Sequence, residues 1–456
     1  MIAGCELTLD LLTVTLSLVS AYSLYERVHA ELHTAFSFRL ALVGSFTWAV
    51  VIVFMLDRAG AYSKGNSLLR VRETEQILRV STQSFFAAMV LGLLAKIPVP
   101  ISLLAWCFGV VPVALFVQKT GFYIFVHMLL VRGYGNERVM IYGAGGVGRR
   151  LFSALSRSPK LGLIPVALVD DDPSQAGRIL FDMGYDRQRS AEVLRGPVNS
   201  RLLKNHAVDL IIIANPSIGR ERFLQTTAEA LAANARIAFV PQLFALSNLW
   251  MDYRDLDGVL LASVGAAPRR AAYEIAKRAC DIVVSLTLML IGIPIFLLIA
   301  LLIKLDSPGP ILFRQERVGR AGVAFPMFKF RTMATTAPPY EFSPRDSQDA
   351  RITRIGRWLR RSSLDELPQL MNVLRGEMSL VGPRPEMPFI VARYTEQERA
   401  RLAVLPGLTG LWQLSGDRNY MIHDNIEYDL YYIQHRNFFM DTALLLHTMI
   451  FAMRGI

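Results

Sequence analysis

The 456-residue chain has few cysteines and few charged residues for its length. Its three cysteines, Cys5, Cys107 and Cys280, lie in or beside apolar runs and match no metal-ligand spacing, which argues against a disulfide framework or a cysteine-bound metal. Charged residues make up 19% of the chain and hydrophobic residues 52%, a balance that indicates membrane segments. The N-terminal stretch MIAGCELTLD lacks the basic region and cleavage site of a signal peptide, so we expect none.

Negative charge is scarcer than positive charge, and the formal net charge is +11. This excess predicts an anionic partner, which could be nucleic acid, a phosphorylated metabolite or an anionic lipid surface. Because apolar segments are abundant, we favour phosphorylated metabolites and a lipid bilayer, and we expect no nucleic acid.

Long apolar segments fill the first quarter of the chain and predict a four-helix transmembrane region over residues 1–120. The loop at 57–76 carries four basic residues, whereas the loop at 26–33 has one arginine against two glutamates. By the positive-inside rule, the second loop and both ends of the region face the cytoplasm. The four segments lie at residues 7–25, 36–56, 77–95 and 99–117.

Residues 134–245 read as a Rossmann-like α/β domain. The stretch RVMIYGAGGVGRR has the pattern of a strand, a glycine turn and a helix start, with glycines at Gly143, Gly145 and Gly148. A second predicted strand ends in Asp170, where an acid that binds a ribose would lie. The pattern leaves nucleotide binding open, because such folds also serve as scaffolds.

A third unit is expected from residue 266 to 456. Its uncharged segment 282–303 is long enough to span a membrane, but Pro294 lies in its middle. Basic residues flank both ends of this segment, so we expect it to enter the membrane and return to the same face. Polar, strongly basic sequence follows, and a last apolar helix is expected at 438–453.

The stretch SSLDELPQL, residues 362–370, places two adjacent carboxylates, Asp365 and Glu366, behind two serines. A structural interpretation is a capping box, in which Ser363 is the N-cap and Glu366 reaches back to its amide. A chemical interpretation is favoured by the many cations around the pair, which are found in RITRIGRWLRR, FKFRTM and SLVGPRPE. Structural ion pairing would explain only some of them.

This arrangement fits phosphoryl transfer. A diphosphate needs cations and a metal to neutralise it, and Mg²⁺ in proteins typically takes one or two carboxylates plus phosphate oxygens. A carboxylate can also act as a nucleophile and form an acyl phosphate. The two adjacent carboxylates could divide these roles.

Five sequence blocks point to a known family. In order, they are KRACDIVVS, PGPILFRQERVGR, FKFRTM, RSSLDELPQLMNVLRGEMSLVGPRPE and PGLTGLWQLSG. With them, residues 271–456 resemble the catalytic region of the large bacterial polyprenyl-phosphate glycosyl-1-phosphate transferases, of the bacterial sugar transferase family. The upstream helices and Rossmann-like domain resemble the long members of that family.

The resemblance implies that a sugar-1-phosphate, with glucose or galactose as the leading candidates, passes from a UDP-sugar to undecaprenyl phosphate with release of UMP. Such a step starts exopolysaccharide, capsule or O-antigen synthesis. Asp365 would be the nucleophile that holds the phosphosugar covalently, and Glu366 would bind Mg²⁺. Substrate contacts are implied for Lys329, Arg331, Arg360 and Arg384.

The resemblance also implies an arrangement in the bacterial inner membrane, with a monotopic, mainly α catalytic domain on the cytoplasmic face. Lys277, Arg278 and Asp281 would anchor the entry of the membrane helix, which Pro294 breaks. The sequence leaves a homodimer open.

Two other functions remain as alternatives. The glycine fingerprint together with Tyr273-x-x-x-Lys277 is similar to a membrane-anchored nucleotide-sugar oxidoreductase or epimerase. However, this Tyr/Lys pair abuts a membrane segment and lies outside the Rossmann-like domain, so we interpret it as coincidental. The second alternative is a non-enzymatic regulator of polysaccharide assembly.

Overall fold

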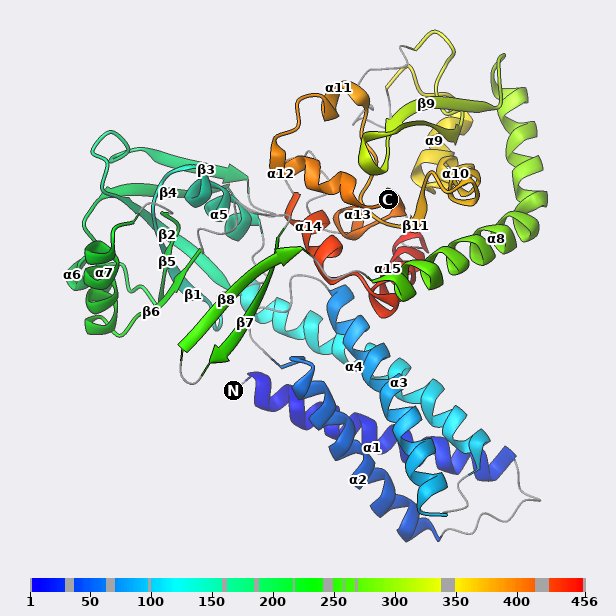
Figure 1. Cartoon of the computed structure of the whole chain (residues 1–456), viewed down its shortest axis with the longest axis horizontal. Coiled ribbons are helices and arrows are strands. Elements are labelled where there is room, and N and C mark those ends of the chain that lie inside the picture. The colour runs from blue at the N-terminus through cyan, green and yellow to red at the C-terminus, as the bar shows by residue number, and fades with distance from the viewer. Residues whose placement is uncertain are drawn as a thin grey trace. The chain divides into compact units, whose positions relative to one another are not determined.

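The computed structural model divides into two compact units, Met1–Phe244 and Ala245–Ile456. Figure 1 shows the elements of both units. The residues that the structure describes are 2–28, 37–62, 70–96, 100–157, 162–183, 188–215, 218–240, 249–256, 259–266, 270–337, 349–414 and 426–453.

Four long helices open the first unit, and all four are long and apolar enough to cross a membrane. Their inward faces share one apolar cluster, which includes Val14, Ile52, Ile77 and Leu115. Many large apolar side chains point outward, as expected for helices that face lipid. The helices are α1 (Ile2–Val28), α2 (Phe38–Arg58), α3 (Arg70–Leu94) and α4 (Ile101–Val131).

One buried ion cluster joins α1 to α4. The Nζ atom of Lys119 lies 2.6 Å from Glu6 Oε1 and 2.8 Å from Asp10 Oδ2. Tyr62 donates a hydrogen bond of 2.8 Å to the same Asp10 oxygen. Because an unpaired charge is costly in an apolar setting, this cluster holds the two helices in register.

The remainder of the first unit is a mixed sheet with the strand order β3-β4-β2-β1-β5-β6. All neighbouring strands are parallel except β3, which pairs antiparallel with β4 at one edge. The strands are β1 (Glu137–Tyr142), β2 (Leu163–Asp170), β3 (Ile179–Met183), β4 (Gln188–Arg195), β5 (Leu210–Ile213) and β6 (Arg236–Phe239). The helices are α5 (Gly146–Arg157), α6 (Ser200–Asn205) and α7 (Arg220–Ala232).

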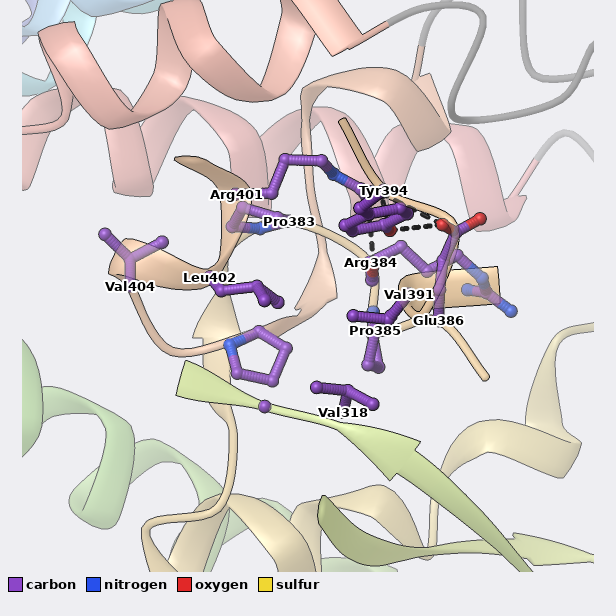
Figure 2. Close-up of a pocket in the computed structure, with 12 residues that line it drawn as sticks. Val318, Pro383, Arg384, Pro385, Glu386, Val391, Tyr394, Arg401, Leu402 and Val404 are labelled. Atoms are coloured by element: carbon purple, nitrogen blue, oxygen red, sulfur yellow. Dashed lines mark hydrogen bonds and ion pairs between the residues drawn. The ribbon is translucent and has the colours of Figure 1, made fainter. Parts of the chain in front are cut away.

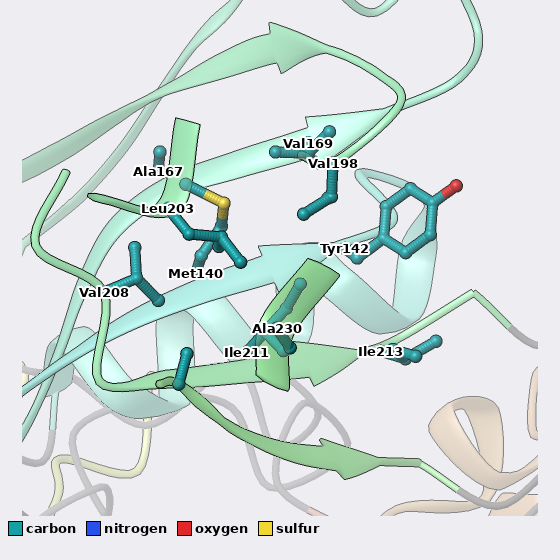
Figure 3. Close-up of a cluster of buried hydrophobic side chains, with 11 residues drawn as sticks. Met140, Tyr142, Ala167, Val169, Val198, Leu203, Val208, Ile211, Ile213 and Ala230 are labelled. Carbon is teal, nitrogen blue, oxygen red and sulfur yellow. The ribbon is translucent and has the colours of Figure 1, made fainter. Parts of the chain in front are cut away.

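The central strands of this sheet are covered on both faces, which explains why β2 and β5 are largely continuous apolar runs. On one face, Met140 and Ile211 pack with Leu203 of α6 and Ala230 of α7, as Figure 3 shows. The opposite face packs against Phe152 and other residues of α5. The predicted α/β domain is therefore confirmed.

The second unit begins with an antiparallel hairpin of β7 (Leu249–Leu256) and β8 (Val259–Ala266). A second antiparallel hairpin, β9 (Leu312–Val318) and β10 (Ala324–Phe330), follows the long helix α8 (Ala271–Asp306), and a short parallel pair joins β11 (Ser379–Val381) to β12 (Gly407–Thr409). The helices that follow α8 are α9 (Arg354–Arg361), α10 (Gln369–Arg375), α11 (Pro388–Val391), α12 (Glu396–Arg399), α13 (Leu411–Leu414), α14 (Ile426–His435) and α15 (Phe438–Met453).

Helix α8 is one continuous helix of 36 residues with Pro294 inside it. In Figure 1 it runs away from α15 and then turns sharply toward β9. A proline in a helix interior removes a hydrogen bond and kinks the helix, which accounts for a bend without a break. The segment predicted to enter the membrane thus forms a bent helix rather than two helices joined by a turn.

Candidate active site

Asp365 and Glu366 lie in a single 3₁₀ turn, Leu364–Glu366, between α9 and α10. Ser363, just before the turn, has a left-handed backbone with φ of +55°, and its amide donates to Arg360 O at 3.2 Å. That amide therefore has a partner, and the Ser363 side chain makes no capping bond within the described residues. The predicted capping box is therefore wrong. The preceding helix, α9, does have a side-chain cap, because Thr353 accepts a hydrogen bond from the amide of Gly356.

The Glu366 carboxylate binds two cations at once. Its Oε1 atom accepts from Lys329 Nζ and from Arg384 Nη2, each at 2.7 Å. Burial alone would raise the pKa of Glu366, but Arg384 and Lys329 outweigh that effect and hold the pKa well below its usual value. Glu366 in turn raises the pKa of Arg384. Glu366 and Arg384 are therefore both charged at neutral pH.

Asp365 has a different environment although it is the adjacent residue. Its side chain is half-buried, and burial raises its pKa above the usual value. Lys329 is the strongest opposing influence, whereas the charge of Glu366 adds to the rise, and Arg360 and Arg384 also oppose it. Two neighbouring carboxylates with pKa values driven in opposite directions are suited to different chemical roles.

Packing of apolar residues brings these side chains together. Ile303 of α8, Phe330 of β10 and Leu359 of α9 share one buried cluster. Because side chains alternate along a strand, burial of Phe330 turns Lys329 toward the opposite face, where Glu366 lies. Asn372 of α10 fixes the same strand, because it accepts from the amide of Phe328 at 3.0 Å and donates to Pro326 O at 2.7 Å.

The backbone of Arg384 is bound by a buried network of hydrogen bonds and ion pairs that the sequence did not predict. Arg401 donates to Arg384 O at 3.0 Å and to Asp429 Oδ2 at 2.7 Å. It also pairs with Glu386, and Figure 2 shows Arg401, Tyr394 and Glu386 joined around a small cavity behind Arg384. The charged stretch EQERARL around Arg401 reads as an exposed helix, so no local signal indicated a buried arginine.

Arg331 does not join the other predicted substrate residues. Its guanidinium is buried and donates to Ser307 O at 2.7 Å and to Pro308 O at 2.8 Å. Arg331 thus ties the end of α8 to the end of β10. Lys329, Arg360 and Arg384, by contrast, all act electrostatically on Asp365.

The three predicted anchor residues of α8 each bind a different element. Lys277 forms an ion pair of 2.8 Å with Asp441 of α15. Arg278 donates to Val373 O and Leu374 O at the end of α10, at 2.6 and 2.8 Å. Asp281 accepts from the amide of Leu380 in β11 at 3.1 Å.

The dehydrogenase-like pair has a structural explanation. Tyr273 and Lys277 both donate to Asp441 Oδ2 at 2.8 Å. Tyr432 binds the other oxygen of Asp441, also at 2.8 Å. These contacts fix α15 to α8, which supports the interpretation of the Tyr/Lys spacing as coincidental.

The glycine fingerprint forms the expected turn between β1 and α5. A Cβ atom at Gly148 would lie 1.7 Å from Gly143 O, whereas one at Gly145 would meet nothing within 4 Å. The Asp170 carboxylate accepts from the amide of Ala144 in this turn at 2.6 Å. The predicted ribose-binding acid is thus bonded to the glycine turn itself in this structure.

Comparison with known families agrees with this site. The bacterial sugar transferase model matches residues 272–455, and a model described as a CoA-binding domain matches residues 57–241. Among solved structures, UDP-D-quinovosamine 4-dehydrogenase from Vibrio fischeri is 22% identical over 28% of this chain and 94% of its own, with a TM-score of 0.21, a likeness too low to bear on function.

Curated relatives cover most of the chain. UDP-glucose:undecaprenyl-phosphate glucose-1-phosphate transferase from Klebsiella pneumoniae is 30% identical over 69% of this chain and 68% of its own. The enzyme of the same name from Xanthomonas campestris is 31% identical over 71% and 68%. Undecaprenyl-phosphate galactose phosphotransferase from Salmonella typhimurium is 29% identical over 75% and 72%. On these matches, the chain belongs to the bacterial sugar transferase family.

Proposed function

We propose that the protein transfers a sugar-1-phosphate from a UDP-sugar to undecaprenyl phosphate and releases UMP. Relatives of similar length carry this activity in their names. The observation that carries the proposal is the half-buried Asp365 beside Glu366, which Lys329 and Arg384 hold by ion pairs. A nucleophilic carboxylate among cations is what transfer of a phosphoryl group from a diphosphate requires.

The proposed transfer proceeds in two displacement steps at phosphorus. In the first, an Asp365 oxygen attacks the phosphorus that bears the sugar, and the bond from that phosphorus to the bridging oxygen breaks, so UMP leaves with the electron pair. In the second, an oxygen of the lipid phosphate attacks the same phosphorus, and the Asp365 carboxylate leaves. Neither step needs a proton from solvent, and the charge on UMP is stabilised by Lys329, Arg360 and Arg384.

The carboxylate donors present fit Mg²⁺. Within the described residues there is no group of three or more His, Cys, Asp or Glu side chains that could hold a metal ion alone. Glu366 would therefore hold Mg²⁺ together with substrate phosphate oxygens, as is common for this ion. Bound there, Mg²⁺ would neutralise charge on the diphosphate. When the diphosphate binds Lys329 and Arg384, it competes with Glu366 and frees that carboxylate.

Helix α8 provides the connection to the lipid substrate. Near its start, Arg278 and Asp281 are bonded to α10 and β11. At its end, Asp306 accepts from the amide of Ile355 in α9 at 3.0 Å. The middle exposes a run of large apolar side chains. We therefore propose that α8 enters the cytoplasmic face of the inner membrane and returns to it, so that Asp365 lies near the lipid phosphate.

Cysteine labelling tests this arrangement. In a background without the three native cysteines, Ala276→Cys and Lys304→Cys place exposed thiols at the two ends of α8. Both should be shielded from an impermeant thiol reagent in intact cells, whereas Ser37→Cys, between α1 and α2, should be labelled. Labelling of the Lys304→Cys protein from outside would show that α8 spans the membrane.

The covalent intermediate gives the direct test of the proposed function. Without lipid acceptor, the protein incubated with UDP-glucose or UDP-galactose should release UMP and gain the mass of one phosphosugar. Asp365→Asn should remove both the adduct and turnover, whereas Glu316→Gln, which changes an exposed carboxylate on β9, should keep them. Turnover by Asp365→Asn, or UMP release without an adduct, would contradict the mechanism. The UDP-sugar that gives the adduct would identify the sugar.

A further inference from the structure

Arg317 on β9 is a half-buried arginine without an ionic partner. Its Nη2 donates to the neutral side chain of Gln315 at 2.7 Å, and its Nη1 makes a long contact of 3.4 Å to Pro385 O. Its Nε atom is buried and has no hydrogen-bond partner. In the part of the chain that the structure describes, no carboxylate lies within ion-pair distance of it.

The strand register directs Arg317 toward the active site. In the β9–β10 hairpin, Arg317 lies opposite Phe325, and Phe313 lies opposite Lys329. Opposite residues in an antiparallel pair, and alternate residues along a strand, share one face. Arg317 is therefore on the face that presents Lys329 to Glu366, and Pro385, which it contacts, directly follows Arg384.

The charges around Arg317 leave it uncompensated. Burial and, after it, the charge of Arg384 lower the pKa of its guanidinium, and Glu386 and Glu366 oppose this only in part, so that the pKa falls to about 10. The two neighbouring arginines, in contrast to Arg317, have ionic partners. Arg384 is paired with Glu366, and Arg401 is paired with Glu386 and Asp429. A half-buried cation with a free donor atom is costly unless an anion binds to it.

We infer that Arg317 binds a phosphate group of a substrate, next to Arg384. The inference rests on the proposed transferase function and adds to it a phosphate-binding residue. The guanidinium fork matches two phosphate oxygens, and its unpartnered Nε can complete such a contact. The phosphate has two sources, the UDP-sugar diphosphate and the lipid phosphate.

Two substitutions in the full-length protein test the assignment. Arg317→Gln removes the charge but keeps a side-chain amide that can bond Gln315, and Arg317→Lys restores the charge without the fork. Arg320→Gln is the matched control, because it removes an exposed arginine three positions along the chain. The Michaelis constants for UDP-sugar and for undecaprenyl phosphate are measured separately. Loss of a charge-assisted contact should raise one of them about 10- to 100-fold in Arg317→Gln.

The constant that rises identifies the source of the phosphate, and Arg317→Lys should recover part of the loss. Thermal-shift measurements of the binding of UDP, inorganic pyrophosphate and a short prenyl phosphate test the phosphate affinity of Arg317 without any need for turnover. If the wild type binds these probes but turns over no UDP-sugar, the proposed function fails while the assignment of Arg317 is still decided. Wild-type affinity of Arg317→Gln for all three probes would overturn the assignment, and a lower kcat alone would then indicate a structural role.

Discussion

Glu366→Gln should lower the stability of the free protein and yet strengthen its binding of a diphosphate. The substitution keeps the shape of the side chain and one carbonyl oxygen, but it removes the charge that Lys329 and Arg384 share. Two cations are then left beside each other without an acid between them. The same excess of positive charge attracts an anion more strongly.

The exposure of the three side chains sets the size of the effect. Glu366 is 18% exposed, Lys329 17% and Arg384 33%, so water screens these pairs only in part. Breaking a fully buried pair costs about 3–5 kcal/mol and breaking a surface pair at most about 1 kcal/mol. An intermediate loss of about 1–3 kcal/mol follows, which for a unit of this size lowers Tm by about 2–12 °C.

Thermal unfolding of the purified protein, with and without UDP and in the absence of Mg²⁺, measures both quantities. UDP should raise the Tm of Glu366→Gln by more than it raises that of the wild type, while turnover with Mg²⁺ falls. Glu316→Gln, an exposed acid on β9, controls for the loss of one negative charge. Wild-type stability together with unchanged UDP binding would refute the view that Glu366 takes the place of substrate phosphate.

Two further predictions concern protonation and backbone packing. Lys329→Gln removes the strongest influence that lowers the pKa of Asp365, so this pKa should rise further. Because the attacking carboxylate must be ionised, the acid limb of the pH–rate profile, where activity is lost as pH falls, should move to higher pH. If this limb does not move, it reports the titration of another group. Gly148→Ala should disrupt the α/β domain because its Cβ would overlap Gly143 O, whereas Gly145→Ala should be tolerated. Limited proteolysis compares the two variants. Equal resistance to the protease would contradict the close contact between Gly148 and Gly143.

The sequence predicted the members of the active site better than their local geometry. The cations of three separate blocks gather around Asp365 because each block has a strong apolar pattern, and Phe330 and Leu359 pack into one cluster as that pattern requires. The capping box failed for a physical reason. Glu366 gains more from two charged partners than from a backbone amide, and Ser363 adopts a left-handed backbone that a capping pattern does not predict.

Contacts between distant residues account for what the sequence could not predict. Lys329 and Arg331 are two residues apart in FKFRTM, a spacing that predicts one face of a strand. In the structure β10 ends at Phe330, and Arg331 turns to the end of α8. Arg401 lies in a charge-rich stretch, and its burial depends on Asp429, which is distant in the chain. Likewise, the fingerprint predicts the glycine turn, while the bond from Ala144 to Asp170 depends on how β1 and β2 pair.

The excess of cations in the active site explains why Glu366 has one role in the free protein and another when substrate is bound. Lys329, Arg384 and Arg317 all lie close enough to interact electrostatically with Glu366, and repulsion among these cations would destabilise the free protein. Glu366 offsets part of that repulsion while no substrate is bound. Asp365, whose pKa burial raises, is less stabilised as an anion and is the more reactive of the two. Binding of a diphosphate then replaces Glu366 on the cations, so substrate should stabilise the fold as it prepares the site for transfer.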